Sequence, residues 1–163
     1  MELIDTARLA PSAANLQPLK YMIITNPAGN SAVFDCTAWA GYLVNWNGPA
    51  PQERPSAYII ILTDKNISEN SAIDIGICAQ TITLAAAEKG LGACMIGSIK
   101  RDQLRQHLNI PPHLKIDLII ALGYPAEQIR LEDITDSIKY YRTADGIHHV
   151  PKRKLDDIII KSL

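Results

Sequence analysis

The sequence lacks several features that would assign a function directly. Its 163 residues include only three cysteines, Cys36, Cys78 and Cys94, so neither a disulfide framework nor a zinc site is indicated. The formal net charge is −1, and the one dense basic run is Lys152-Arg153-Lys154. This balance excludes a broad nucleic-acid-binding surface, although a run of this kind can hold one phosphate.

Membrane and export signals are also missing. The longest apolar stretch, from Ile73 to Leu91, is interrupted by Asp74, Gln80, Glu88 and Lys89, which argues against membrane insertion. The first residues, Met-Glu-Leu-Ile-Asp, are acidic and amphipathic, unlike a signal peptide. We therefore expect a cytoplasmic protein with no membrane partner. The length is that of one domain covering residues 1–163.

The usual catalytic motifs carried by protein side chains are absent. There is no Gly-x-Ser-x-Gly elbow, no His-Glu-x-x-His, no P-loop and no Gly-x-Gly-x-x-Gly dinucleotide fingerprint. His148 and His149 are adjacent, but neighbouring side chains diverge in a strand or a helix, so we favour surface or packing roles over a metal site. No residue is named as catalytic or metal-binding. An enzyme with this sequence would rely on a bound cofactor.

Hydrophobic periodicity predicts an α+β fold with one sheet between helical layers. The predicted helices are residues 2–10, 71–89 and 100–108, and the predicted strands are residues 21–25, 57–63, 93–96 and 117–123. Residues 31–55 show only a weak hydrophobic pattern and predict neither a helix nor a strand. Residues 125–151 read as irregular, with a short strand at 138–141 as one option, and the tail from Lys154 reads as a short helix or an added strand.

The predicted helix at 71–89 has the clearest end signals. Ser71 is expected to cap it, with Asp74 in a capping-box-like position, and Gly90 is expected to end it in the left-handed conformation. The helix is apolar around its whole circumference, so it has to be covered on all sides. In a chain of this size we expect part of that cover to come from a second subunit.

The segment Pro11-Ser-Ala-Ala-Asn-Leu-Gln-Pro18 is richer in polar groups than a plain connector requires. Ser12, Asn15 and Gln17 can present hydrogen-bonding groups, while Pro11 and Pro18 fix the backbone at each end. Such a turn suits a flat ligand with polar edges. The alternative is an ordinary loop that ends a helix.

An ordered set of blocks resembles the FMN-dependent nitroreductase family. The blocks are Pro11–Pro18, Asp74-Ile-Gly-Ile-Cys-Ala-Gln80, Ala85–Gly92, Met95-Ile-Gly-Ser98 and Leu118–Pro125. Two further blocks, Trp46–Pro49 with Glu53–Ile59 and Tyr140–Arg142 with Asp145–Arg153, resemble a small subfamily. The likeness covers nearly the whole chain in the correct order.

The resemblance implies a three-layer fold with a mainly antiparallel central sheet between helices, assembled as an interlocked homodimer. FMN would lie at the subunit interface, with NAD(P)H as electron donor. A ping-pong reaction would pass hydride through flavin N5 to an electron-poor acceptor, namely a nitro compound, a quinone or an enone. The alternative is a degenerate member that keeps the dimer fold, binds flavin weakly and serves as a binding or regulatory module.

The same resemblance assigns residues to the flavin. Its contacts from one subunit would be Ser12, Ala13, Asn15 and Gln17. The turn containing Ile96 and Gly97 would lie along the isoalloxazine, where a side chain in place of glycine would collide with the ring. Lys152 and Arg153 would meet the phosphate. The plainer alternatives are that Gly97 simply ends a strand and that Lys152 and Arg153 belong to a solvated basic run. Trp39 and Trp46 would either shape the acceptor pocket or serve as packing aromatics.

The chain departs from the family pattern at two places. The family usually carries an Arg-x-Ser-x-Arg segment about twenty residues before the Pro-Ser motif, and the chain begins too late to contain it. Three explanations are open: Lys152 to Lys154 compensate, FMN binds loosely, or the segment is missing from the sequence. Leu19 stands where the family often has tryptophan, which affects packing more than chemistry.

Overall fold

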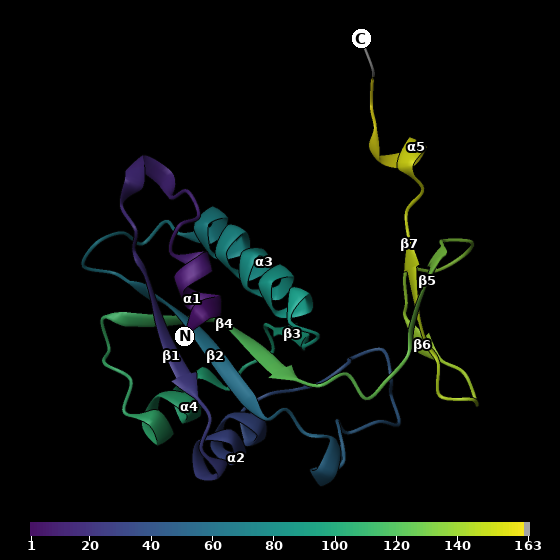
Figure 1. Cartoon of the computed structure of the whole chain (residues 1–163), viewed down its shortest axis with the longest axis horizontal. Coiled ribbons are helices and arrows are strands. Elements are labelled where there is room, and N and C mark those ends of the chain that lie inside the picture. Colours follow the sequence, from purple (N-terminus) through teal and green to yellow (C-terminus); the bar gives the residue numbers. More distant parts are fainter. Residues whose placement is uncertain (162–163) are drawn as a thin grey trace. The chain divides into compact units, whose positions relative to one another are not determined.

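A computed structural model describes residues 1–161, and the described chain divides into two units (Figure 1). The first unit comprises Met1–Trp39 and Pro49–Tyr124, and the second comprises Ala40–Gly48 and the chain from Pro125 onward. The organisation as one domain stays a prediction. Within residues 1–161, no helix has the length and apolar character needed to cross a membrane.

A four-stranded antiparallel sheet forms the centre of the first unit. Its strand order is β1 (Leu19–Ile24), β2 (Ala57–Asp64), β4 (Leu114–Gly123) and β3 (Gly92–Ile96). Residues 58–63 of β2 are all buried, as expected for an apolar strand covered on both faces. The predicted strands at 21–25, 57–63, 93–96 and 117–123 are thereby confirmed, with small shifts at their ends.

Helices cover both faces of this sheet. The helices α1 (Glu2–Ala7) and α3 (Ala72–Glu88) share one buried cluster with Ile59 and Ile61. The other face carries α2 (Pro27–Asp35) and α4 (Arg101–Leu108), whose buried residues pack with Ile60 and Leu62. Alternate residues of β2 therefore supply two separate cores, and the predicted three-layer arrangement is confirmed.

The ends of α3 differ in part from the prediction. Ser71 precedes the helix, but its hydroxyl makes no capping bond and instead lies 2.6 Å from the Thr63 hydroxyl. The expected capping box is therefore wrong, because Asp74 also bonds elsewhere. Gly90 does adopt the left-handed conformation, with φ of +71°.

Residues in the weakly patterned region form the helix α2, which the sequence reading missed. Asn26 caps α2 through a 2.8 Å bond from the Gly29 N–H to its side-chain oxygen, and Pro27 is the first helical residue. These two residues directly follow the predicted strand at 21–25, and they also fit a helix start. The short 3-10 helices η1 (Ala13–Asn15) and η2 (Pro51–Glu53) occupy loops.

The second unit holds a further sheet, so the expectation of a single sheet is wrong. Its order is β5 (Ile129–Asp133), β7 (His148–Lys152) and β6 (Tyr141–Arg142), with β5 and β7 parallel. Most of β5 is exposed, and β6 has only two residues. Strands this short and exposed give only a weak signal in the sequence: in β5, Ile129 and Leu131 alternate with polar residues over five positions. The tail forms a short helix, α5 (Leu155–Ile158), one of its two expected forms.

Candidate functional site

The loop between α1 and β1 has an uncommon backbone conformation. Ala14, Asn15 and Gln17 have φ angles of 49°, 54° and 52°. Residues other than glycine seldom adopt positive φ, although asparagine tolerates it better than most. Ala13 to Gln17 are also exposed, so the loop receives little support from burial. Its conformation has to be held by specific hydrogen bonds.

Asp74 provides the main anchor for this loop. The Ser12 hydroxyl donates to its Oδ2 over 2.5 Å, and the Ala13 backbone N–H donates to its Oδ1 over 3.1 Å. The Gln17 backbone N–H in turn donates to the Ser12 oxygen over 3.0 Å. Asp74 is only 3% exposed and lies in the first turn of α3, where the helix dipole favours a carboxylate.

The loop presents a donor and an acceptor from two neighbouring amides. Gln17 Nε2 donates to both the backbone oxygen and the side-chain oxygen of Asn15, each over 3.1 Å. No bond within residues 1–161 uses Asn15 Nδ2 or Gln17 Oε1. The exposed surface of the loop therefore offers one N–H₂ group and one carbonyl oxygen, without a formal charge.

The turn after β3 combines a buried residue with an open one. Ile96 is 5% exposed and belongs to the core, so its side chain is unavailable to a ligand. Gly97 is exposed, and an added Cβ would meet no atom within 4 Å. Nothing in the first unit therefore requires glycine there. Arg101 fixes the turn by donating to the Gly97 oxygen over 3.3 Å and to the Ile116 oxygen over 2.9 Å.

The loop and the turn belong to opposite edges of the central sheet. The loop leads into β1 and the turn follows β3, and these are the two edge strands. Three interstrand spacings separate them, about 14 Å. The two sets of predicted residues are thus not brought together within one chain.

The predicted phosphate ligands lie in the second unit. Lys152 is the last residue of β7, Arg153 follows it, and both side chains are exposed. Neither forms an ion pair in the described part of the chain. Backbone bonding holds the strand end, because the Ile134 N–H donates to the Lys152 oxygen over 2.9 Å.

His148 and His149 point to different partners, as the alternation of a strand requires. His148 Nδ1 lies 3.2 Å from Glu127, and His149 Nδ1 lies 2.9 Å from Glu132. The hydrogen bond from His149, together with one from Tyr141, lowers the pKa of the Glu132 carboxyl. The expected divergence of the two imidazoles is confirmed. No group of three or more potential metal ligands occurs among residues 1–161.

Both tryptophans pack against neighbouring side chains. Trp39 contacts the core, with its ring centroid 5.6 Å from that of Phe34. The Arg142 guanidinium lies over Trp46 at 4.9 Å from the ring centroid. These contacts favour the packing interpretation over an acceptor pocket for both residues.

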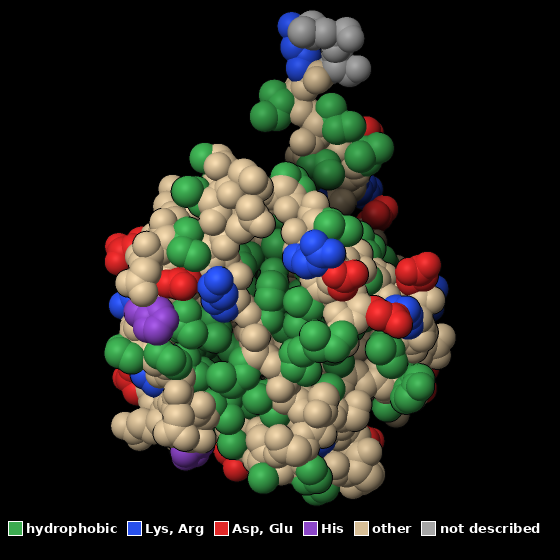
Figure 2. Space-filling model, turned by 60° about the vertical axis from the view of Figure 1, so that its left-hand side comes forward, with side chains coloured by type: hydrophobic (Ala, Val, Ile, Leu, Met, Phe, Trp, Pro, Cys, Tyr) green, Lys and Arg blue, Asp and Glu red, His purple; other side chains and the backbone are tan. Residues whose placement is uncertain are grey.

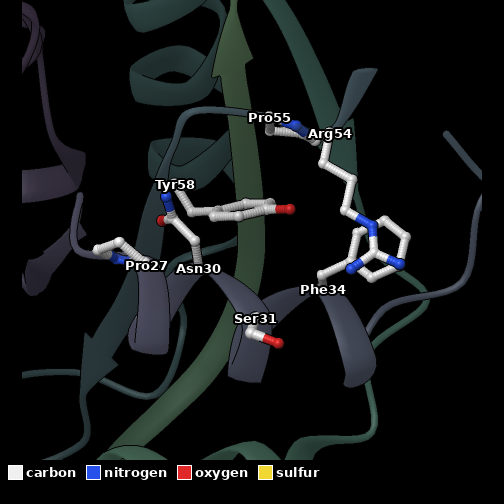
Figure 3. A pocket seen from close by; sticks show the side chains of 7 residues that line it. All are labelled: Pro27, Asn30, Ser31, Phe34, Arg54, Pro55 and Tyr58. Atoms are coloured by element: carbon white, nitrogen blue, oxygen red, sulfur yellow. The ribbon is translucent and has the colours of Figure 1, made fainter. Parts of the chain in front are cut away.

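One small cavity of about 140 Å³ opens beside α2 (Figure 3). Its lining residues are Pro27, Asn30, Ser31, Phe34, Arg54, Pro55 and Tyr58. Arg54 stacks on Phe34 at 3.8 Å from the ring centroid, while the Tyr58 hydroxyl is buried without a partner in the described chain. Burial raises the pKa of Tyr58 to about 12. None of the predicted site residues lines this cavity.

Sequence reasoning missed the role of Asp74. Its place three residues after Ser71, before an apolar run, is the pattern of a capping box, so its carboxylate was assigned to the helix end. The signal that could have revealed it is the nearby loop with unpaired N–H and O–H donors. Ser12 and Asp74 are 62 residues apart in the sequence, and only the tertiary structure shows that they are in contact.

Comparison with known proteins places the chain in a family. The sequence model of the Nitroreductase family matches residues 1–124, so the chain belongs to the nitroreductase family. A candidate NADH dehydrogenase/NAD(P)H nitroreductase of Archaeoglobus fulgidus is 25% identical over 135 residues, or 78% of this chain and 72% of the relative. An FMN reductase (NADPH) of Bacillus subtilis is 38% identical over 58 residues, 34% of this chain and 23% of that protein.

Solved structures show the same fold. An FMN-dependent nitroreductase of Clostridium difficile R20291 matches with a TM-score of 0.63 and 23% identity, covering 78% of this chain and 75% of that chain. A nitroreductase family protein of Streptococcus pneumoniae TIGR4 matches with a TM-score of 0.65 and 20% identity, covering 99% and 87%. The predicted family and the nitroreductase-like fold are both confirmed.

Proposed function

We propose that this protein is an FMN-dependent oxidoreductase that uses NAD(P)H to reduce an electron-poor acceptor such as a nitro compound, a quinone or an enone. The observation that carries the proposal is the anchored loop at Ser12–Gln17 in a member of the nitroreductase family. Two proteins similar to this chain are described as an FMN-dependent nitroreductase and an FMN reductase (NADPH). When bound, FMN would supply hydride transfer at N5.

The residues present fit an isoalloxazine. Its pyrimidine edge alternates carbonyl oxygens with an N–H, and the loop offers a complementary donor at Asn15 and acceptor at Gln17. The open space over Gly97 would admit a flat ring, which a side chain at that position would obstruct. Neither the loop nor the Gly97 turn has to donate or accept a proton in the reaction, so we name no catalytic residue. Their part is to orient the ring and leave one face free.

The phosphate would be held by Lys152 and Arg153. Both are exposed cations without an ion-pair partner in the described residues, so they can meet a dianion without breaking an internal contact. An arginine can bind two phosphate oxygens through its fork of N–H groups.

A homodimer would complete the site. Because the loop and the Gly97 turn lie at opposite sheet edges, one ring could touch both only if two subunits contributed. The outer side of α3 is apolar and exposed, with Ile73 at 75% and Leu84 at 61% exposure, and it offers a surface for the second copy. Hydrophobic side chains also gather in the middle of the face drawn in Figure 2.

Titration of the purified protein with FMN, followed by anaerobic addition of NADH or NADPH and an acceptor, tests the proposal. We expect a saturable FMN complex, loss of its visible flavin band on adding the reduced nucleotide, and recovery of the band with a quinone or nitro compound. Failure to bind FMN would refute the proposed function. An FMN complex that neither nucleotide reduces would instead indicate the binding or regulatory module.

A further inference from the structure

We infer that Asp74 is a positioning residue of the proposed flavin site: its carboxylate holds the Ser12–Gln17 loop in the shape that presents Asn15 and Gln17. The identity of the ligand rests on the proposed function. The role of Asp74 in the loop rests on the loop geometry alone. Figure 1 shows the loop beside the beginning of α3, which carries Asp74.

The loop needs an anchor because its backbone is unfavourable and exposed. Three of its residues, Ala14, Asn15 and Gln17, have positive φ without being glycine. The side-chain bonds between Gln17 and Asn15 remain inside the loop, so they cannot fix it to the fold. The two bonds to Asp74, from Ser12 and from Ala13, attach it to a helix whose other face is packed in the core.

Ser12 connects Asp74 to the far end of the loop. Its hydroxyl has one hydrogen, which goes to Asp74, and its oxygen accepts the Gln17 backbone N–H. A serine hydroxyl has no second hydrogen to donate. The geometry therefore assigns Ser12 a role in supporting the amides of Asn15 and Gln17, instead of the direct flavin contact that the resemblance implies.

A carboxylate suits position 74 because it accepts from both partners at once. One oxygen receives the Ser12 O–H and the other receives the Ala13 N–H. Asparagine has the same shape but only one acceptor oxygen, so if that oxygen accepted the Ala13 N–H, its NH₂ group would face the Ser12 hydroxyl. Ser12 would then have to turn its hydrogen away and accept instead, and a charge-assisted bond would be replaced by a weaker neutral one. With Asp74 only 3% exposed, water has little access to replace the lost charge-assisted bond.

The test compares Asp74→Asn with Asp117→Asn. Asp117 is a matched control because its side chain is 6% exposed and is bonded by Thr63 and Lys115, outside the loop. In the protein without flavin, amide hydrogen exchange at Ala13 and Gln17 should accelerate about tenfold or more in D74N and remain unchanged in D117N. The affinity of D74N for FMN and for riboflavin should fall about tenfold or more, because the loop is proposed to contact the ring that both ligands share.

Two serine variants provide an independent check that preserves the buried charge. Ser12→Ala should reproduce the faster exchange at Gln17, and Ser12→Thr, which keeps the hydroxyl, should restore it. Unchanged exchange and unchanged flavin affinity in D74N would overturn the inference. If the wild-type protein bound no FMN, the proposed function would fail, while the exchange data would still decide whether Asp74 holds the loop.

Discussion

Replacing Lys152 and Arg153 together with alanine should weaken FMN binding much more than riboflavin binding. Each cation is proposed to make a charge-assisted contact with the phosphate, and such contacts contribute about 1.5–3 kcal/mol. Both side chains are exposed, so solvent screening favours the lower end of this range. The pair then contributes about 3 kcal/mol, which corresponds to about a hundredfold increase in the Kd of FMN.

Fluorescence titration of both ligands measures this difference, since riboflavin lacks the phosphate. Lys65→Ala with Arg130→Ala is a charge-matched control that removes two other exposed cations. We expect that control to bind FMN within about threefold of the wild-type affinity, because neither side chain is proposed to contact the phosphate and exposed charges are screened. The assignment of Lys152 and Arg153 as phosphate ligands would be refuted if the double variant bound FMN and riboflavin equally more weakly. It would also be refuted if the variant bound both ligands as tightly as the wild type.

Three further changes test separate parts of the structure. Tyr58→Phe removes a buried hydroxyl without a partner in the described chain, so the unfolding free energy should stay constant or rise by about 1 kcal/mol. The pKa of Tyr58 is raised by burial from 10.0 to about 12, so as the pH rises from 10 to 12 the unfolded chain releases this proton while the folded chain keeps it, and the unfolding free energy falls. Denaturant titrations across this range should show a larger loss in the wild type than in Y58F, in which Tyr21 still has a raised pKa; equal curves would contradict the prediction. Leu84→Arg, at a position 61% exposed in the single chain, should leave the fold intact and shift sedimentation from dimer to monomer; a persistent dimer would place the interface elsewhere. Gly97→Val should leave the melting temperature of the flavin-free protein nearly unchanged, because its Cβ meets no atom, yet weaken FMN binding about tenfold or more. Tight FMN binding by that variant would remove Gly97 from the site.

The centre of the main sheet was predictable from the sequence because β2 and much of β4 are buried on both faces. The run from Ala57 to Thr63 is continuous and apolar, and that signal needs no tertiary information. Gly90 likewise marked the end of α3 through its conformational freedom. The small second sheet gave a much weaker signal, since Ile129 and Leu131 alternate with polar residues over only five positions.

The sequence indicated which segment to examine as a candidate site, but not what each residue does there. The polar composition of Pro11–Pro18 indicated a loop built for more than connection, and its exposure agrees with that reading. Local patterns could not reveal that Asp74 holds the loop, because the pairing depends on how α3 packs beside α1. Nor could they show that Ile96 is buried while Gly97 is open, since both follow from the packing around the end of β3.

The most direct test of the account is the flavin content and reactivity of the purified protein. FMN bound as isolated, or after incubation with excess FMN and gel filtration, should be released on denaturation in proportion to the protein. Adding NADH or NADPH without oxygen should bleach its visible band, and a quinone or nitro compound should restore it. A protein that stays colourless after incubation with FMN, and that oxidises neither nucleotide in its presence, would contradict the account.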